Sequence, residues 1–76
     1  MYITPTTGNE VIINIVNRKK QLKQQVMLAV EHALNNSLES VPLNEGDHEL
    51  NGLWVSQYNG EFRLHLGNKR LGYIML

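Results

Sequence analysis

The sequence predicts an α+β domain in which a helical N-terminal half packs on a three-stranded antiparallel β-meander. Apolar residues between Glu10 and Leu38 recur at the helical period, whereas residues 52–76 alternate and are cut by two turn signals. With 76 residues, 42% of them hydrophobic, the chain is expected to form one small folded domain. Residues 9–37 are its helical part, 38–51 an acidic connector and 52–76 the meander.

The helical part is expected to form one long helix or two short ones. At 100° per residue ten of its apolar side chains occupy one continuous arc, interrupted by Lys19 and Lys23: Val11, Ile12, Ile15, Val16, Leu22, Val26, Ala29, Val30, Ala33 and Leu34. An unbroken helix over residues 9–37 would be about 43 Å long, roughly twice the length of a six-residue strand. Such a helix would extend beyond its sheet unless it broke or found a partner, and the two lysines in the arc mark Asn17–Lys20 as the interval for a break. Thr7 and Glu10 have the spacing of a capping box at the start of the helix.

Two segments are alternatives for an added N-terminal strand. The stretch "VIINIV" (residues 11–16) has five β-branched residues in six, which favours a strand although its periodicity favours a helix. Residues 2–4 are the other candidate. In the connector, Pro42 and Gly46 break regular structure, and Val41, Leu43 and Leu50 are expected to anchor it to the core.

The meander begins with a strong hairpin signal, Asn59-Gly60, which is typical of a type I′ turn. This turn predicts the pairs from Tyr58–Glu61 back to Leu53–Leu66. At the second turn, "GNKR", both a two-residue Asn68-Lys69 turn and a four-residue loop pair Leu66 with Leu71. Either alternative sets His65 beside Gly72, Leu64 beside Tyr73 and Arg63 beside Ile74.

Because side chains alternate along a strand, this register divides the sheet into two faces. One face is almost wholly apolar and is expected to receive the helix: Leu53, Val55, Gln57, Phe62, Leu64, Leu66, Leu71, Tyr73 and Met75. The other face is mixed and contains the only tryptophan: Trp54, Ser56, Tyr58, Glu61, Arg63, His65, Gly72, Ile74 and Leu76.

The mixed face is the candidate binding site. Tryptophan, tyrosine and arginine are the residues most enriched at protein-binding hot spots, so the residues predicted to bind a partner are Trp54, Tyr58, Arg63, His65 and Ile74. The same aromatics could stack on nucleic-acid bases. In a purely structural alternative, Trp54 covers Gly72. The final "YIML" is also expected to be an exposed edge strand that could pair with another chain.

Charge is distributed unevenly although the net charge is zero. A basic patch is predicted at Arg18, Lys19, Lys20 and Lys23. Residues 24–62, in contrast, include six acidic residues but no lysine or arginine. A zero net charge argues against a strongly electrostatic nucleic-acid binder. The polarity instead favours an oriented contact with a charged partner or a self-complementary dimer. The basic patch is either a phosphate-contacting surface or a solvated one.

No cofactor, metal or catalytic function is expected. The chain has no cysteine, which excludes disulfides and thiolate sites. The acidic tract of Glu45, Asp47, His48 and Glu49 lacks the calcium-loop pattern and is interpreted as a solvated loop. Ser56 and His65 share the mixed face as diagonal neighbours, but a flat sheet offers neither an oxyanion hole nor a pocket.

The sequence thus predicts a small non-catalytic protein-interaction module, with a homodimer as one form of the contact. Small modulators or inhibitors of phage or mobile-element type have this size. The alternative is a nucleic-acid-binding protein that uses the Trp/Tyr/Arg face and the Lys/Arg cluster. No apolar run approaches the roughly 20 residues that span a bilayer, and the N-terminus lacks signal-peptide features. We therefore expect a cytoplasmic protein, in the host cytoplasm if it is viral, with no membrane partner and no small-molecule substrate.

Overall fold

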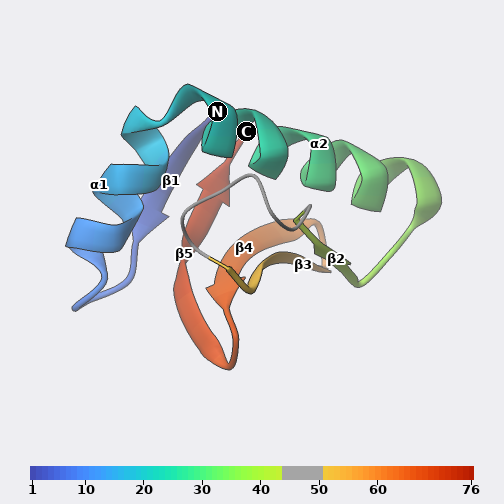
Figure 1. Ribbon diagram of the computed structural model, residues 1–76. Helices are drawn as coiled ribbons and strands as arrows, with labels where there is room; N and C mark the ends of the chain where they lie inside the picture. Colours follow the sequence, from blue (N-terminus) through green and yellow to red (C-terminus); the bar gives the residue numbers. More distant parts are fainter. Residues whose placement is uncertain (44–50) are drawn as a thin grey trace.

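The computed structural model describes residues 1–43 and 51–76, which form two helices and five strands (Figure 1). In chain order the elements are β1 (Tyr2–Pro5), α1 (Glu10–Arg18), α2 (Lys20–Asn36), β2 (Ser40–Pro42), β3 (Leu53–Tyr58), β4 (Glu61–Leu66) and β5 (Lys69–Met75). The predicted α+β class is confirmed.

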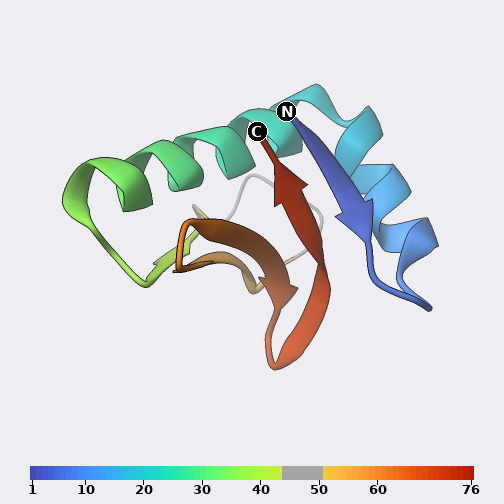
Figure 2. The ribbon, with the colours of Figure 1, turned by 180° about the vertical axis from the view of Figure 1, so that it is seen from behind.

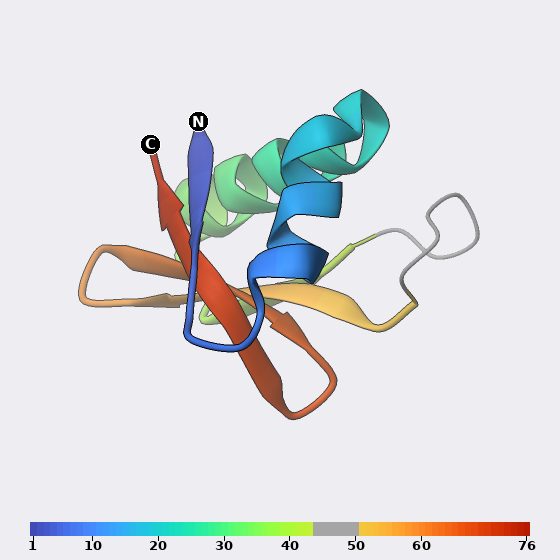
Figure 3. The same ribbon diagram turned by 90° about the vertical axis from the view of Figure 1, so that its left-hand side faces the viewer.

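All neighbouring strands are antiparallel, in the order β1-β5-β4-β3-β2. Both helices lie on the same side of this sheet (Figure 3). The predicted meander is present as β3–β4–β5, but three strands are too few, because β1 and β2 extend it at both edges. Seen from behind, β1 and β5 run side by side, and the two chain ends meet there (Figure 2).

The helical half is broken at Lys19, inside the predicted interval. Lys19 has an extended backbone, with φ −88° and ψ 109°, and it separates α1 from α2. Ser37 ends α2 in the left-handed conformation, with φ 52°. Residues 11–16 belong to α1, so the added N-terminal strand is the other alternative, at the chain's start. Burial of Ile13 and Val16 against the sheet outweighs the β propensity of the segment.

The predicted capping box is wrong, because α1 begins at Glu10 with Asn9 as its N-cap. The Glu10 carboxylate accepts a hydrogen bond from the Gly8 backbone N–H at 3.2 Å. The Asn9 side-chain amide instead donates to the Thr6 hydroxyl at 2.7 Å and to the Arg70 carbonyl at 3.3 Å. Asn9 thus attaches the start of α1 to β5.

The first hairpin of the meander has the predicted register. Asn59 and Gly60 have φ values of 51° and 79°, as a type I′ turn requires. β3 and β4 then pair without interruption from Tyr58–Glu61 to Leu53–Leu66.

The second hairpin differs from the prediction. Leu66 pairs with Lys69, not Leu71, because the turn residues are Gly67 and Asn68. Gly67 has φ 58°, and glycine at the first turn position is typical of a type II′ turn. A bulge between the His65–Arg70 and Leu64–Gly72 pairs then leaves Leu71 as the extra residue.

The position of this turn and the bulge together shift the far part of β5 by one residue relative to the predicted pairing, which exchanges its faces. Arg63 therefore lies opposite Tyr73, and Phe62 opposite Ile74. Ile74 points into the core and is only 5% exposed, whereas Tyr73 is 36% exposed. The core between the sheet and the helices is built from Ile3, Ile13, Val16, Leu22, Val26, Ala29, Val30, Ala33, Val41, Leu43, Leu53, Val55, Phe62, Leu64, Leu71 and Ile74.

Candidate interaction face

The side of the sheet opposite the helices carries most of the residues singled out from the sequence. We call it the open face and define it by Trp54, Ser56, Tyr58, Arg63, His65, Arg70 and Tyr73. Register places Tyr58 opposite Glu61 and the other six residues in two cross-strand rows. One row is Pro42, Trp54, His65 and Arg70, and the other is Ser40, Ser56, Arg63, Tyr73 and Thr4. Both helices lie on the other side (Figure 3).

Trp54 and His65 form a stacked pair at the centre of the first row. Their ring centroids are 4.1 Å apart and their planes differ by 13°. The Trp54 indole N–H donates to the Gly67 carbonyl at 2.8 Å, which fixes the ring along the sheet. Because this pairing satisfies the indole nitrogen, Trp54 presents an ordered apolar surface at small cost in side-chain entropy.

His65 also pairs with Ser56, whose hydroxyl oxygen lies 2.7 Å from His65 Nε2. Partial burial, followed by the positive charges of Arg70 and Arg63, lowers the pKa of His65 from its ordinary value of 6.5. In the neutral tautomer with its proton on Nδ1, Nε2 accepts a hydrogen bond from the Ser56 hydroxyl. The pair has the donor and acceptor of a serine–histidine dyad. Among the described residues, however, no carboxylate orients the other ring nitrogen.

Arg63 is held by its neighbours on both sides. Its guanidinium forms a 3.0 Å ion pair with Glu61 and lies 5.5 Å from the centroid of the Tyr73 ring. Its Nε is buried and has no hydrogen-bond partner among the described residues. Arg70 donates to the Tyr73 hydroxyl at 3.5 Å. Tyr73 therefore links the two arginines.

Two parts of the predicted site need correction. Ile74 is not on the open face, because the register shift turns it into the core. Gly72 does not lie beside His65, so Trp54 does not cover it; Gly72 pairs with Leu64 and lies close to the Thr4 carbonyl of β1. The other predicted residues are on the open face, and Tyr58 is the most exposed of them at 62%.

Sequence reasoning missed Tyr73 and Arg70. The available signal was Gly67-Asn68, since Gly-X is the residue pattern of a two-residue type II′ turn. Isoleucine is also more often buried than tyrosine, which favours Ile74 over Tyr73 for the core.

The basic patch lies in the helical layer, at the junction of α1 and α2, and so on the opposite side of the sheet from the open face (Figure 3). Lys20 and Lys23 lie on α2, whereas Arg18 ends α1 and Lys19 occupies the break. The four cations therefore do not share one continuous helix, and the structure does not bring them together with Trp54.

The sheet edges formed by the described strands are poorly suited to pairing with another chain. β5 is not an edge, contrary to the expectation for "YIML", because β1 covers it. On β1, the Asn17 side chain occupies the outer backbone groups of Ile3: its Oδ1 accepts from the Ile3 N–H at 3.3 Å and its Nδ2 donates to the Ile3 carbonyl at 3.0 Å. β2 has three residues and includes Pro42, which has no N–H.

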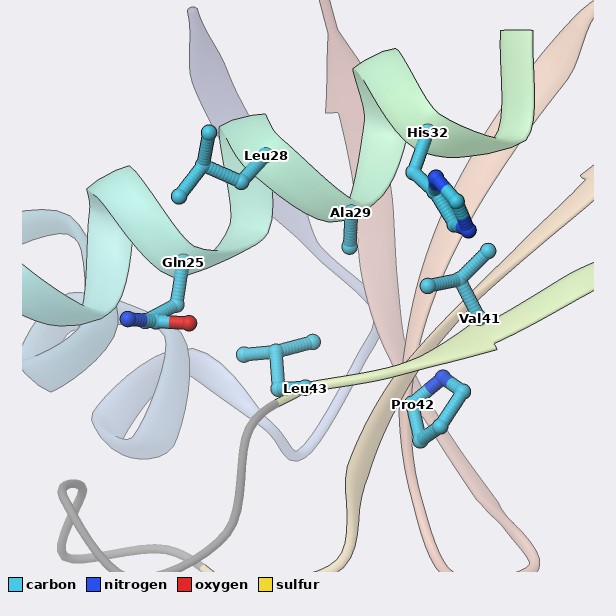
Figure 4. A pocket seen from close by; sticks show the side chains of 7 residues that line it. All are labelled: Gln25, Leu28, Ala29, His32, Val41, Pro42 and Leu43. Carbon is cyan, nitrogen blue, oxygen red and sulfur yellow. The ribbon is translucent and has the colours of Figure 1, made fainter. Parts of the chain in front are cut away.

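A hollow lies between α2 and β2 (Figure 4). In the connector, Val41 and Leu43 are buried as predicted and form part of its wall. Five of its seven lining residues are apolar, and the full lining is Gln25, Leu28, Ala29, His32, Val41, Pro42 and Leu43. Its two polar side chains, Gln25 and His32, do not form the converging polar set that positions a substrate.

The acidic tract of Glu45, Asp47, His48 and Glu49, and Leu50 beside it, lie outside the described residues. Within residues 1–43 and 51–76, no cluster of three or more metal-ligating side chains occurs. No helix in that part of the chain combines the length and apolar character needed to cross a membrane. Comparison with protein-family models, curated proteins and solved structures gave no match.

Proposed function

We propose that the protein is a small non-catalytic interaction module that binds a partner protein through the open face. The stacked Trp54–His65 pair carries this proposal. An ordered tryptophan beside tyrosines and arginines, on the side of the sheet away from the helices, has the composition of a binding hot spot.

The state of the sheet edges supports contact through the face. Because Asn17 occupies the outer groups of Ile3 and β2 is short, strand addition has little backbone to use at either edge. The open face instead offers preformed side chains. Arg63 and Tyr73 are already positioned by their mutual contact, so little rotamer freedom is lost on binding.

Nucleic-acid binding has less support. Phosphate contacts supply most of the affinity of such proteins, but the basic patch and the open face are on opposite sides of the sheet. On the open face itself, Glu61 already partly neutralises Arg63. On this face, the phosphates of a nucleic-acid strand stacked on Trp54 would therefore have Arg70 as their main cationic contact.

The test uses wild type, Trp54→Ala, Tyr58→Ala and Val11→Ala as immobilised baits in one cell extract, with bound proteins quantified by mass spectrometry. Val11 is an apolar control on α1 and is 76% exposed. We expect one protein to bind wild type and Val11→Ala at low and high salt. Trp54→Ala should weaken its purified complex by about 30-fold or more, which is the loss of a hot spot of about 2 kcal/mol.

Trp54→Ala must be shown to be folded by its thermal unfolding curve. Tyr58→Ala gives a second readout, because so exposed a side chain contributes little to the fold. Equal binding by all four baits would contradict the proposal. Recovery of nucleic acid that is released by salt and lost in Lys20→Glu would favour the alternative function.

A further inference from the structure

The outward surface of α2 carries large apolar side chains that the core does not use. Met27 is 38% exposed, Leu28 57% and Leu34 50%. The core side of the same helix is formed by Leu22, Val26, Ala29, Val30 and Ala33, so the apolar surface of α2 extends beyond the side that packs on the sheet. Apolar surface of this extent on a helix is normally covered by a further partner.

A shallow groove runs along this outward surface beside the start of the chain. Met1, Met27 and Leu28 provide its apolar part, and Lys20, Lys23 and Gln24 complete the lining. Its volume of about 570 Å³ is ample for an aliphatic side chain. The groove is therefore an apolar depression with two lysines beside it.

Charged and apolar residues follow one another along α2 in a self-complementary order. Lys20, Lys23, Met27, Glu31 and Leu34 fall within an arc of about 80° at 100° per residue, and we call them the α2 stripe. Lys23 lies four residues before Met27, and Glu31 lies four residues after it. Neither charge has an ion-pair partner among the described residues.

We propose that a second copy of this chain packs on the α2 stripe, with the two α2 helices antiparallel about a two-fold axis at Met27. The axis places Lys23 of each copy opposite Glu31 of the other, so two ion pairs flank the central methionines. The same register places Leu34 of the second copy opposite Lys20, at the groove beside Met1. A two-fold contact requires this kind of self-complementary surface.

The order of charges favours a second copy over an unrelated partner. A basic end, an apolar centre and an acidic end match themselves only when the second helix is reversed, and antiparallel helices pack along such stripes in bundles. α2 has 17 residues and is about 25 Å long, which allows several side chains of each copy to meet. The open face remains free on both copies.

Sedimentation equilibrium of the full chain, over a range of concentrations, tests this dimer. Wild type should form a dimer, and Lys23→Glu and Glu31→Lys should each raise its Kd at least about tenfold, because each variant places like charges opposite one another twice. An equimolar mixture of the two variants should restore the wild-type Kd, since every pair is then of opposite charge. The double variant should restore it within one chain.

Lys69→Glu is the matched control, because it reverses the same charge at the β4–β5 turn and should leave the Kd unchanged. Trp54→Ala should also leave it unchanged, which separates this dimer from the function proposed for the open face. A wild-type chain that stays monomeric at concentrations on the order of 1 mM overturns the proposal. So does a mixture that fails to restore the dimer, or a dimer that is lost in Trp54→Ala.

Discussion

The two hairpins of the meander share β4 but differ in regularity. β3 and β4 pair over their whole length across the Asn59-Gly60 turn, and this hairpin places Trp54 beside His65. β4 and β5 meet across Gly67-Asn68 and contain a bulge. The bulge turns Tyr73 outward and Ile74 inward, so the irregular hairpin supplies both an aromatic ring to the open face and an aliphatic side chain to the core.

The difference shows how far a turn determines a sheet. A hairpin turn sets the pairing only as far as the first bulge, and one extra residue then exchanges the two faces. The bulge beside His65 and Leu71 therefore determines which side chains of β5 lie on the open face.

The largest expected effect concerns the two faces of β5. Ile74→Ala should lower the free energy of unfolding by about 2–5 kcal/mol, because it leaves a cavity in the core. Tyr73→Ala should cost less than about 1.5 kcal/mol, since the ring is partly exposed and loses chiefly its contact with Arg63. Urea unfolding of both variants measures the difference. If Tyr73→Ala lowered the free energy of unfolding more than Ile74→Ala, the result would support the register without the bulge.

A second test concerns the space next to the bulge. A Cβ at Gly72 would lie 2.5 Å from the Thr4 carbonyl oxygen, which is backbone and cannot rotate away. Gly72→Ala should therefore cost about 1–3 kcal/mol and loosen β1. Hydrogen exchange of the β1 amides should accelerate more than exchange in β3.

Gly60→Ala is the control in the regular hairpin. Its Cβ would meet no atom within 4 Å, so its cost arises only from a φ of 79° and should be about 1 kcal/mol. In Gly60→Ala, hydrogen exchange of the β1 amides relative to those of β3 should therefore be the same as in wild type. Loosened β1 amides in both variants would show that the close approach to Thr4 is not the cause.

The smallest effect is the pH dependence contributed by His65, which lies next to the bulge. Its pKa is lowered in the folded chain, so the unfolded chain binds the proton more tightly. This contribution to stability is complete above about pH 6.5 and is lost as the pH falls from there toward the folded pKa. The difference in unfolding free energy between wild type and His65→Gln should therefore shrink on acidification.

Val11→Ala provides the control for this measurement, because Val11 is exposed on α1 and the substitution removes no titratable group. Its difference from wild type should stay constant over the same pH range. A constant difference between wild type and His65→Gln from pH 8 to pH 5 would contradict the assignment.

Local signals in the sequence were sufficient for α2, for the interval in which the helical half can break and for the first hairpin, but they left residues 11–16 open between helix and strand. Each depends on neighbouring residues, such as the apolar arc or the positive φ values that Asn59-Gly60 adopts. The four correctly placed open-face residues, Trp54, Tyr58, Arg63 and His65, all lie in that regular hairpin.

The remaining features depend on contacts between distant segments. β1 is a strand because β5, at the other end of the described chain, pairs with it, and because Asn17, fourteen residues from Ile3, binds its outer side. β2 is a strand because it lies along β3. The bulge at Leu71 lets Ile74 reach the core, a gain that depends on the helices above it. No local pattern contains this information.

The placement of β1 also has a consequence for the order in which the chain can fold during synthesis. β1 is made before every other described element, but its sheet partner β5 is the last described strand to be made. Until then, β1 can bind Asn17, which lies only fourteen residues from Ile3 and emerges early. The Asn17 amide can thus hold β1 on α1 while the meander is translated, and the sheet closes when β5 inserts between β1 and β4.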